Sequence, residues 1–154
     1  MQDRDKLPAE PSQARRFKKT RAAQSAALSE DYVELIADLI EAEGEARVTD
    51  IARRLGVSHA TANKNINKMK REGLATSKPY RGVFLTESGA ELASRSRNRH
   101  RVLVDLLLAV GVPEDVAEQD AEGMEHHVSD LAMRAFEGFL KARSPSPHNQ
   151  EQTS

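Results

Sequence analysis

Apolar residues recur every three or four positions along most of this chain, which is the spacing of a helix with one buried face. The first clear run contains Tyr32, Leu35, Ile36, Leu39 and Ile40. Ser29 is the expected N-cap of this helix, because its hydroxyl can accept a bond from a free backbone N–H. Gly44 is its expected end, because glycine readily adopts the left-handed conformation that closes many helices.

Two more helices are expected before the pattern changes, a short one over 49–55 and a longer one from Ser58 to about Glu72. Gly56 and the residue after it predict a tight turn between them. A pair of short helices joined by such a turn is typical of a helix-turn-helix.

The spacing then shifts to that of two short strands, 74–78 and 83–86, on either side of the turn-forming run 79–82 (PYRG). Helices are expected again over 86–110, 114–124 and 128–142. The predicted fold class is therefore mainly α with a small β-hairpin wing.

The predicted domain organisation has four parts. A winged helix-turn-helix domain over 28–90 is followed by a helical domain over 91–143. Residues 1–27 are polar and basic without sustained periodicity, so we expect a flexible arm, with contact to phosphates as the alternative to a solvated tail. Residues 144–154 are expected to form a disordered tail.

Composition narrows the possible classes of protein. Hydrophobic residues make up 38% of the chain and aromatic residues only 4%, so the core must be largely aliphatic. No apolar stretch approaches the roughly 20 residues of a membrane span, and no signal peptide is evident, which predicts a cytoplasmic protein without a membrane partner. The absence of cysteine leaves His, Asp and Glu as possible metal ligands.

The net charge of −1 conceals two oppositely charged regions. Residues 47–81 contain nine Lys/Arg and two acids, whereas residues 113–140 contain eight acids and one Arg. This asymmetry predicts that one region binds an anion and the other a cation.

The helix that begins after Ser58 has the composition of a DNA-reading helix. Ala62, Ile66 and Met69 share one face and should pack inward, which leaves small, amide and cationic side chains on the other. Such side chains can approach base edges and bind phosphates in a major groove, although a merely solvated face is the alternative. The predicted DNA-contacting residues, including those near the hairpin tip, are Ser58, His59, Ala60, Thr61, Asn63, Lys64, Asn67, Arg71, Lys78 and Arg81.

The acidic region offers candidate metal ligands. Glu122, Glu125 and His126 have spacing i, i+3 and i+4, and would share one face if the segment is helical. His100 precedes them, and the pair Asp31 and Glu34 belongs to the first predicted helix. Taken alone, an acidic stripe is commonly a solvated helix face. Together these oxygen and nitrogen donors favour Mn²⁺ or Fe²⁺, and four carboxylates suggest a bridged pair of ions.

Several motifs in order along the chain resemble a known family. They are 31–36 (DYVELI), 51–58 (IARRLGVS), 81–86 (RGVFLT), Arg99-His100 and 120–129 (DAEGMEHHVS). The chain resembles the manganese transport regulators, the manganese-responsive branch of the diphtheria-toxin-repressor family. The resemblance implies that Asp31, Glu34, His100, Glu122, Glu125 and His126 bind two Mn²⁺ per subunit, with Glu34 and Glu125 as bridging carboxylates. Iron-type relatives have Met in place of Asp31 and Cys in place of Glu122, so the branch implied is the manganese one, with Fe²⁺ as a second possible activator.

The function expected from this resemblance is metal-activated transcriptional regulation, mainly repression of manganese uptake genes. Residues 28–90 would form the DNA-binding domain and residues 91–143 the metal-binding and dimerisation domain. Mn²⁺ would activate a homodimer to bind a palindromic double-stranded operator, and no small organic substrate is expected. The alternatives are an iron-responsive or a metal-independent winged-helix repressor. Glu122-x-x-Glu125-His126 differs from an inverted zincin motif by one residue, but the chain has no phosphate loop or Ser/His/Asp pattern, so we do not expect an enzyme.

Overall fold

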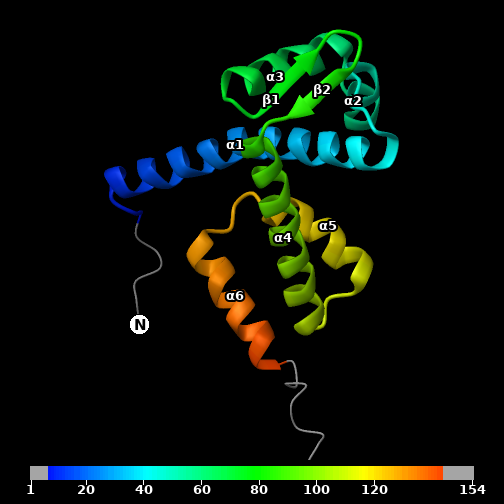
Figure 1. The fold of residues 1–154 in the computed structure, drawn as a ribbon. Helices are drawn as coiled ribbons and strands as arrows, with labels where there is room; N and C mark the ends of the chain where they lie inside the picture. Colours follow the sequence, from blue (N-terminus) through cyan, green and yellow to red (C-terminus); the bar gives the residue numbers. More distant parts are fainter. Residues whose placement is uncertain (1–6, 144–154) are drawn as a thin grey trace, which may run out of the picture. The chain divides into compact units, whose positions relative to one another are not determined.

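The computed structural model describes residues 7–143 and divides into two compact units, one ending at Ser94 and the other beginning at Arg95. The described residues form six helices and one two-stranded hairpin, which are labelled in Figure 1. In the described part of the chain, no helix has the length and apolar character needed to cross a bilayer. The predicted tail over 144–154 and the first six residues lie outside the described range.

The first helix, α1, runs over Glu10–Glu43 and is much longer than expected. The prediction that residues up to 27 lack regular structure is therefore wrong from Glu10 onward, and Ser29 is not an N-cap. The reason is composition: the segment after Pro11 is rich in Ala, Arg, Lys and Gln, which favour helix without needing a buried face. Gly44 ends the helix as predicted, with φ of 78°.

The helix-turn-helix follows the prediction closely. Helix α2 spans Val48–Leu55 and helix α3 spans His59–Arg71. Gly56 is left-handed, with φ of 67°, which permits the tight turn. The Ser58 hydroxyl accepts a bond from the Thr61 backbone N–H at 3.1 Å and so caps α3.

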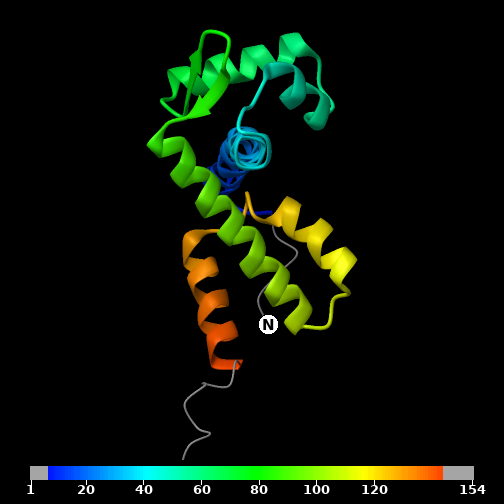
Figure 2. The same ribbon diagram turned by 45° about the vertical axis from the view of Figure 1, so that its right-hand side comes forward.

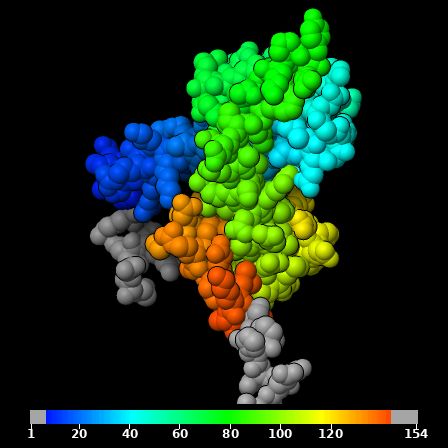
Figure 3. Space-filling model, in the orientation of Figure 1, coloured from blue at the N-terminus to red at the C-terminus, as the bar shows by residue number. Residues whose placement is uncertain are grey.

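The hairpin consists of β1, Ala75–Lys78, and β2, Gly82–Leu85, paired antiparallel from Ala75↔Leu85 to Lys78↔Gly82. Its tip projects from the surface at the top of Figure 3, where Tyr80 is 100% exposed. At the other side of β2, the Val83 backbone N–H donates to the Ala46 carbonyl at 2.8 Å. A Cβ on Gly82 would lie 2.4 Å from the same carbonyl oxygen, so only glycine permits this approach.

The core of the first unit is aliphatic, as the composition predicts, apart from one buried tyrosine. Its centre is formed by Tyr32, Val33, Ile36, Ile51, Ile66, Met69 and Val83. The Tyr32 hydroxyl accepts a bond from the Asn65 side-chain amide at 3.0 Å, which satisfies its polar group inside the protein.

The second unit contains most of α4, Glu87–Ala109, together with α5, Glu114–Met124, and α6, Asp130–Arg143. Helices α5 and α6 flank the C-terminal part of α4 in both ribbon views (Figures 1 and 2). A second, smaller core is formed by Val102, Leu103, Val104, Ala117, Ala121 and Met133. This packing fixes the face of α4 that carries His100 against the face of α5 that carries the acidic residues.

Candidate metal centre and DNA-binding surface

Helix α3 has the two faces that its sequence predicts. Ala62, Ile66 and Met69 are buried, which fixes the rotation of the helix on the core. The predicted contact residues on this element are all exposed: Ser58, His59, Ala60, Thr61, Asn63, Lys64, Asn67 and Arg71. Lys78 and Arg81 are likewise exposed near the hairpin tip. Their exposure makes these side chains accessible to a duplex, and their contact with DNA stays a prediction.

The exposed residues of α3 differ in what they already bind. Ser58 and Thr61 are engaged in the helix cap, with their hydroxyls 2.9 Å apart. The Asn63 amide lies 3.3 Å from the Nδ1 of His59. Within residues 7–143, Lys64 and Arg71 form no ion pair, so their charges are available for phosphates.

The structure brings three of the predicted metal ligands of the second unit together. His100 on α4 and Glu122 and Glu125 at the end of α5 offer ligand atoms that all lie within 4.8 Å of one another. The Nδ1 of His100 is 2.9 Å from an Oε of Glu125 and 3.5 Å from an Oε of Glu122. The packing of α4 against α5 thus brings together residues that are far apart in the sequence.

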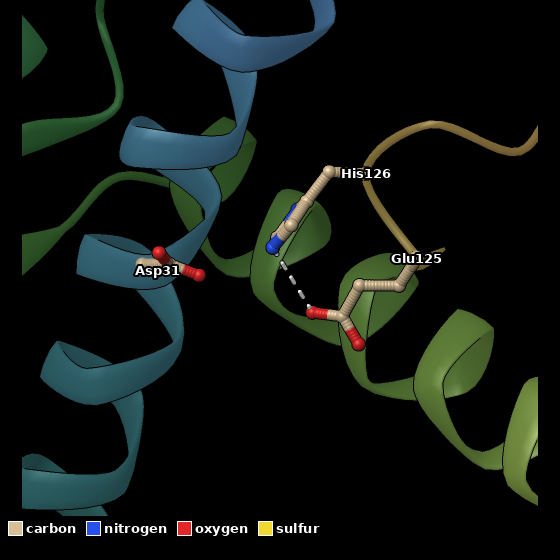
Figure 4. Close-up of side chains that lie close together, drawn as sticks. All are labelled: Asp31, Glu125 and His126. Atoms are coloured by element: carbon tan, nitrogen blue, oxygen red, sulfur yellow. Dashed lines mark ion pairs between the residues drawn. The ribbon is translucent and has the colours of Figure 1, made fainter. Parts of the chain in front are cut away.

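The expectation that Glu122, Glu125 and His126 lie on one continuous helix is only partly correct. Helix α5 ends at Met124, and Glu125 is its C-cap, with helical φ and ψ of −57° and −31°. Glu125 therefore stays on the same face as Glu122, whereas His126 lies in the turn that follows. Figure 4 shows the His126 imidazole beside the Glu125 carboxylate, and its Nε2 is 3.5 Å from the Oε1 of Glu125.

Burial sets the electrostatics of this cluster. Glu125 is only 1% exposed, and a buried carboxylate requires positive or hydrogen-bonding partners. His100 is one such partner. Burial lowers the pKa of His100, but the hydrogen bond to Glu118 and the charge of Glu125 outweigh burial and raise the pKa above its usual value. The site thus stabilises positive charge, as a cation-binding site must.

Two residues of this site were missed by sequence reasoning. Glu118 lies 2.7 Å from the Nε2 of His100. Its spacing was a usable signal, because Glu118, Glu122 and Glu125 follow one another at i, i+4 and i+7 on one helix face.

Arg99 is the second missed residue, and it organises the turn between α5 and α6. Its guanidinium donates to the carbonyl of Glu125 at 2.9 Å, to the carbonyl of Val128, and to the carboxylate of Asp130 at 2.9 Å. No side-chain pattern encodes bonds to backbone carbonyls, so spacing alone could not reveal this role.

Asp31 and Glu34, the two remaining predicted ligands, lie in the first unit on α1. Both are partly buried, and both interact with other groups of the protein. Their spacing of i and i+3 on a continuous helix places them on one face of α1, as predicted. Their assignment as metal ligands stays a prediction.

A winged helix-turn-helix followed by a helical unit with a carboxylate–imidazole cluster defines a class of metal-dependent DNA-binding regulators. Residues 26–83 match the iron dependent repressor N-terminal DNA-binding domain, and residues 86–154 match the iron dependent repressor metal-binding and dimerisation domain. The chain belongs to the iron-dependent repressor family.

The relatives of this chain place it in the MntR branch of the family. The chain is 48% identical over 125 residues to the transcriptional regulator MntR of Escherichia coli O157:H7, covering 81% of each chain. It is 46% identical over 130 residues to the MntR of Salmonella typhimurium, covering 84% of this chain and 83% of the relative. To the HTH-type MntR of Bacillus subtilis it is 40% identical over 100 residues, covering 65% and 70%.

Solved structures show the same fold. One is a manganese-dependent transcriptional repressor in complex with manganese, with 32% identity, a TM-score of 0.65, and coverage of 73% of this chain and 52% of that chain. The manganese regulator SloR has 30% identity, a TM-score of 0.65, and coverage of 78% and 56%. The present chain thus spans about half the length of these two solved chains.

These findings fix the class of function. The protein is a DNA-binding transcriptional regulator with a divalent metal as cofactor, and its partners are DNA and a second copy of itself. The prediction that it is not an enzyme is confirmed, because its relatives are transcriptional regulators. The alternatives of an iron-responsive or a metal-independent repressor find no support among these relatives.

Proposed function

We propose that this protein is a manganese-responsive regulator in which Mn²⁺ activates operator binding. The observation that carries this proposal is the convergence of His100, Glu122 and Glu125 within 4.8 Å around a buried carboxylate. The cluster lies in the part of the chain that matches a metal-binding domain. The MntR relatives support manganese as the physiological ion.

The donor set fits this ion. Carboxylate oxygens and imidazole nitrogens without sulfur suit Mn²⁺ better than soft metals, and imidazoles argue against Mg²⁺ or Ca²⁺. When bound, the ion supplies positive charge that neutralises the acidic cluster. His100, Glu122, Glu125 and His126 would hold it from the second unit, and Asp31 and Glu34 from the first. The family resemblance supports two ions per subunit, with Glu34 and Glu125 among the carboxylates that would hold them.

The proposed mechanism follows from this division of the ligands between two units. Asp31 and Glu34 belong to the DNA-binding unit, so their participation would couple ligand geometry to the orientation of α3. In a homodimer on a palindromic operator, the two recognition helices must reach major grooves about 34 Å apart. Metal activates if it binds the DNA-competent arrangement more tightly than other arrangements. The regulated genes would be mainly those of manganese uptake, and the protein would act in the cytoplasm.

The test is operator binding by Glu125→Gln and Asp31→Asn variants, titrated with Mn²⁺ after chelation, with Fe²⁺ and Zn²⁺ as parallel titrations. Both variants keep the shape of the side chain and remove its charge. We expect Mn²⁺-dependent binding to be lost in each while the circular dichroism spectrum is retained. Glu114→Gln, an exposed acid at the start of α5, is the matched control and should bind like the unaltered protein. Unchanged Mn²⁺ dependence in both ligand variants would overturn the proposal.

A further inference from the structure

The imidazole of His100 presents its two ring nitrogens to different carboxylates. Its Nδ1 lies 2.9 Å from Glu125, within the candidate ligand cluster. Its Nε2 lies 2.7 Å from Glu118, which is not among the predicted ligands. His100 is therefore bonded on both edges of the ring by side chains from α5 and its C-cap.

Only one of these nitrogens can serve as the ligand in the cluster. A neutral imidazole carries a proton on one nitrogen and a lone pair on the other, and a metal ion needs the lone pair. Nδ1 faces both Glu122 and Glu125, so it is the nitrogen that faces a shared ion. Nε2 must then carry the proton, and the group that receives its hydrogen bond is the Glu118 carboxylate.

We propose that Glu118 is a positioning residue that holds His100 with its Nδ1 lone pair directed into the metal site. This inference rests on the proposed metal function. Histidine ligands commonly donate their second N–H to a carboxylate, which fixes both the tautomer and the ring orientation. Glu118 acts through His100, since it bonds the ring nitrogen that faces away from Glu122 and Glu125.

The placement of Glu118 on α5 suits this role. Glu118 lies one helical turn before Glu122, on the helix that also positions the ligand carboxylates. The helix therefore holds Glu118 at a fixed distance from Glu122. Its side chain is 55% exposed, in contrast to the buried Glu125, so water can still solvate the other carboxylate oxygen. The alternative is an ordinary exposed ion pair, which would contribute little to stability and nothing to metal binding.

The first test is Mn²⁺ affinity and stoichiometry of the full-length protein, measured by the electron paramagnetic resonance signal of free Mn²⁺. Glu118→Ala removes the acceptor, and we expect affinity to fall about 10–100-fold with the number of bound ions unchanged. Glu118→Gln keeps an acceptor oxygen and should lose less. Glu114→Ala, an exposed acid one turn earlier on α5, is the control and should leave affinity unaltered. Unreduced affinity in Glu118→Ala would overturn the proposal, and a lost ion would instead make Glu118 a ligand.

The second test is the tautomer of His100 in the metal-free protein, read from two-bond ¹H–¹⁵N correlations at a pH where the ring is neutral. A His100→Gln variant assigns the signals. The Nε2–H tautomer donates to Glu118 and the Nδ1–H tautomer donates to Glu125, so we expect the Nε2–H population of the unaltered protein to fall in Glu118→Ala. An unchanged tautomer would overturn the role of Glu118. If the unaltered protein failed to bind Mn²⁺ at all, the proposed function would fail, while the tautomer would still decide the positioning role.

Discussion

At the scale of single residues, the second unit compensates one buried carboxylate with several partners. Glu125 has His100 at 2.9 Å and His126 at 3.5 Å, and Arg99 fixes its backbone carbonyl. Removing a single partner of a buried charge is costly, since the charge is then left without compensation. A divalent cation would take over this compensating role, and a neutral imidazole, unlike a lysine ammonium, has a lone pair with which to bind that cation.

Prediction from sequence works at this scale where a residue's role depends on which face of a helix it occupies. The buried and exposed sides of α3 follow from helical angle alone, as Ile66 and Lys64 illustrate. Helical angle places Glu118 on the face of Glu122 and Glu125, but neither its bond to His100 nor the bonds of Arg99 follow from that angle. Their roles depend on a carbonyl and a ring nitrogen that only tertiary packing brings near.

Lys64 provides a test of the DNA-binding surface. It is exposed on α3 and forms no ion pair within the described residues, so a phosphate contact would release a counterion. We expect Lys64→Ala to weaken operator binding and to reduce the slope of log K against log salt by about 1. Lys141→Ala, an exposed lysine at the end of α6, should leave the slope unchanged. An unaltered slope for Lys64→Ala would remove it from the contact residues.

At the scale of elements, predicted bounds are good where a residue with special backbone chemistry marks an end. Helices α2 and α3 follow the prediction to within a residue or two because Gly56 and Ser58 define the turn between them. Helix α5 begins and ends at the predicted residues, 114 and 124, and Pro113 precedes its start. The first half of α1 was not predicted because a helix that is stabilised by residue propensity alone shows no hydrophobic periodicity.

The N-terminal half of α1 can be tested directly. Ala22→Pro removes a backbone hydrogen bond and introduces a clash, which costs about 3 kcal/mol in a helix interior. Because this half of α1 is largely exposed, few tertiary contacts oppose its unwinding. We expect the helical circular dichroism signal to fall relative to the matched Ala22→Ser variant. Equal spectra for the two variants would contradict a continuous helix through Ala22.

At the scale of the whole molecule, opposite charges are segregated into the two functional parts. The basic stretch 47–81 contains helix α3 and the hairpin tip, while the acidic stretch 113–140 contains three of the six candidate metal ligands. The fold class could be predicted from sequence because the order of helices and hairpin is distinctive. The assembly of His100 with the acids of α5 required the packing of the second core, which no local pattern specifies.

Linkage provides a prediction at this scale. If Mn²⁺ tightens operator binding, the operator must tighten Mn²⁺ binding by the same factor, expected to be about 5–150-fold. The two factors can be measured on one preparation, by Mn²⁺ titration with and without duplex and by duplex titration with and without Mn²⁺. A scrambled duplex of equal length is the control. A factor of 1 in both titrations would show that Mn²⁺ does not activate operator binding, and unequal factors would show that the two titrations do not follow the same equilibrium.

The two tyrosines of the chain differ greatly in their exposure to solvent. The chain has no tryptophan, so its ultraviolet emission comes from Tyr32, 1% exposed in the first core, and Tyr80, fully exposed at the hairpin tip. A water-soluble quencher can reach only the second of these. The quenchable part of the emission therefore reports the environment of the wing without a label, and shielding of that part by a duplex would signal that the wing has docked.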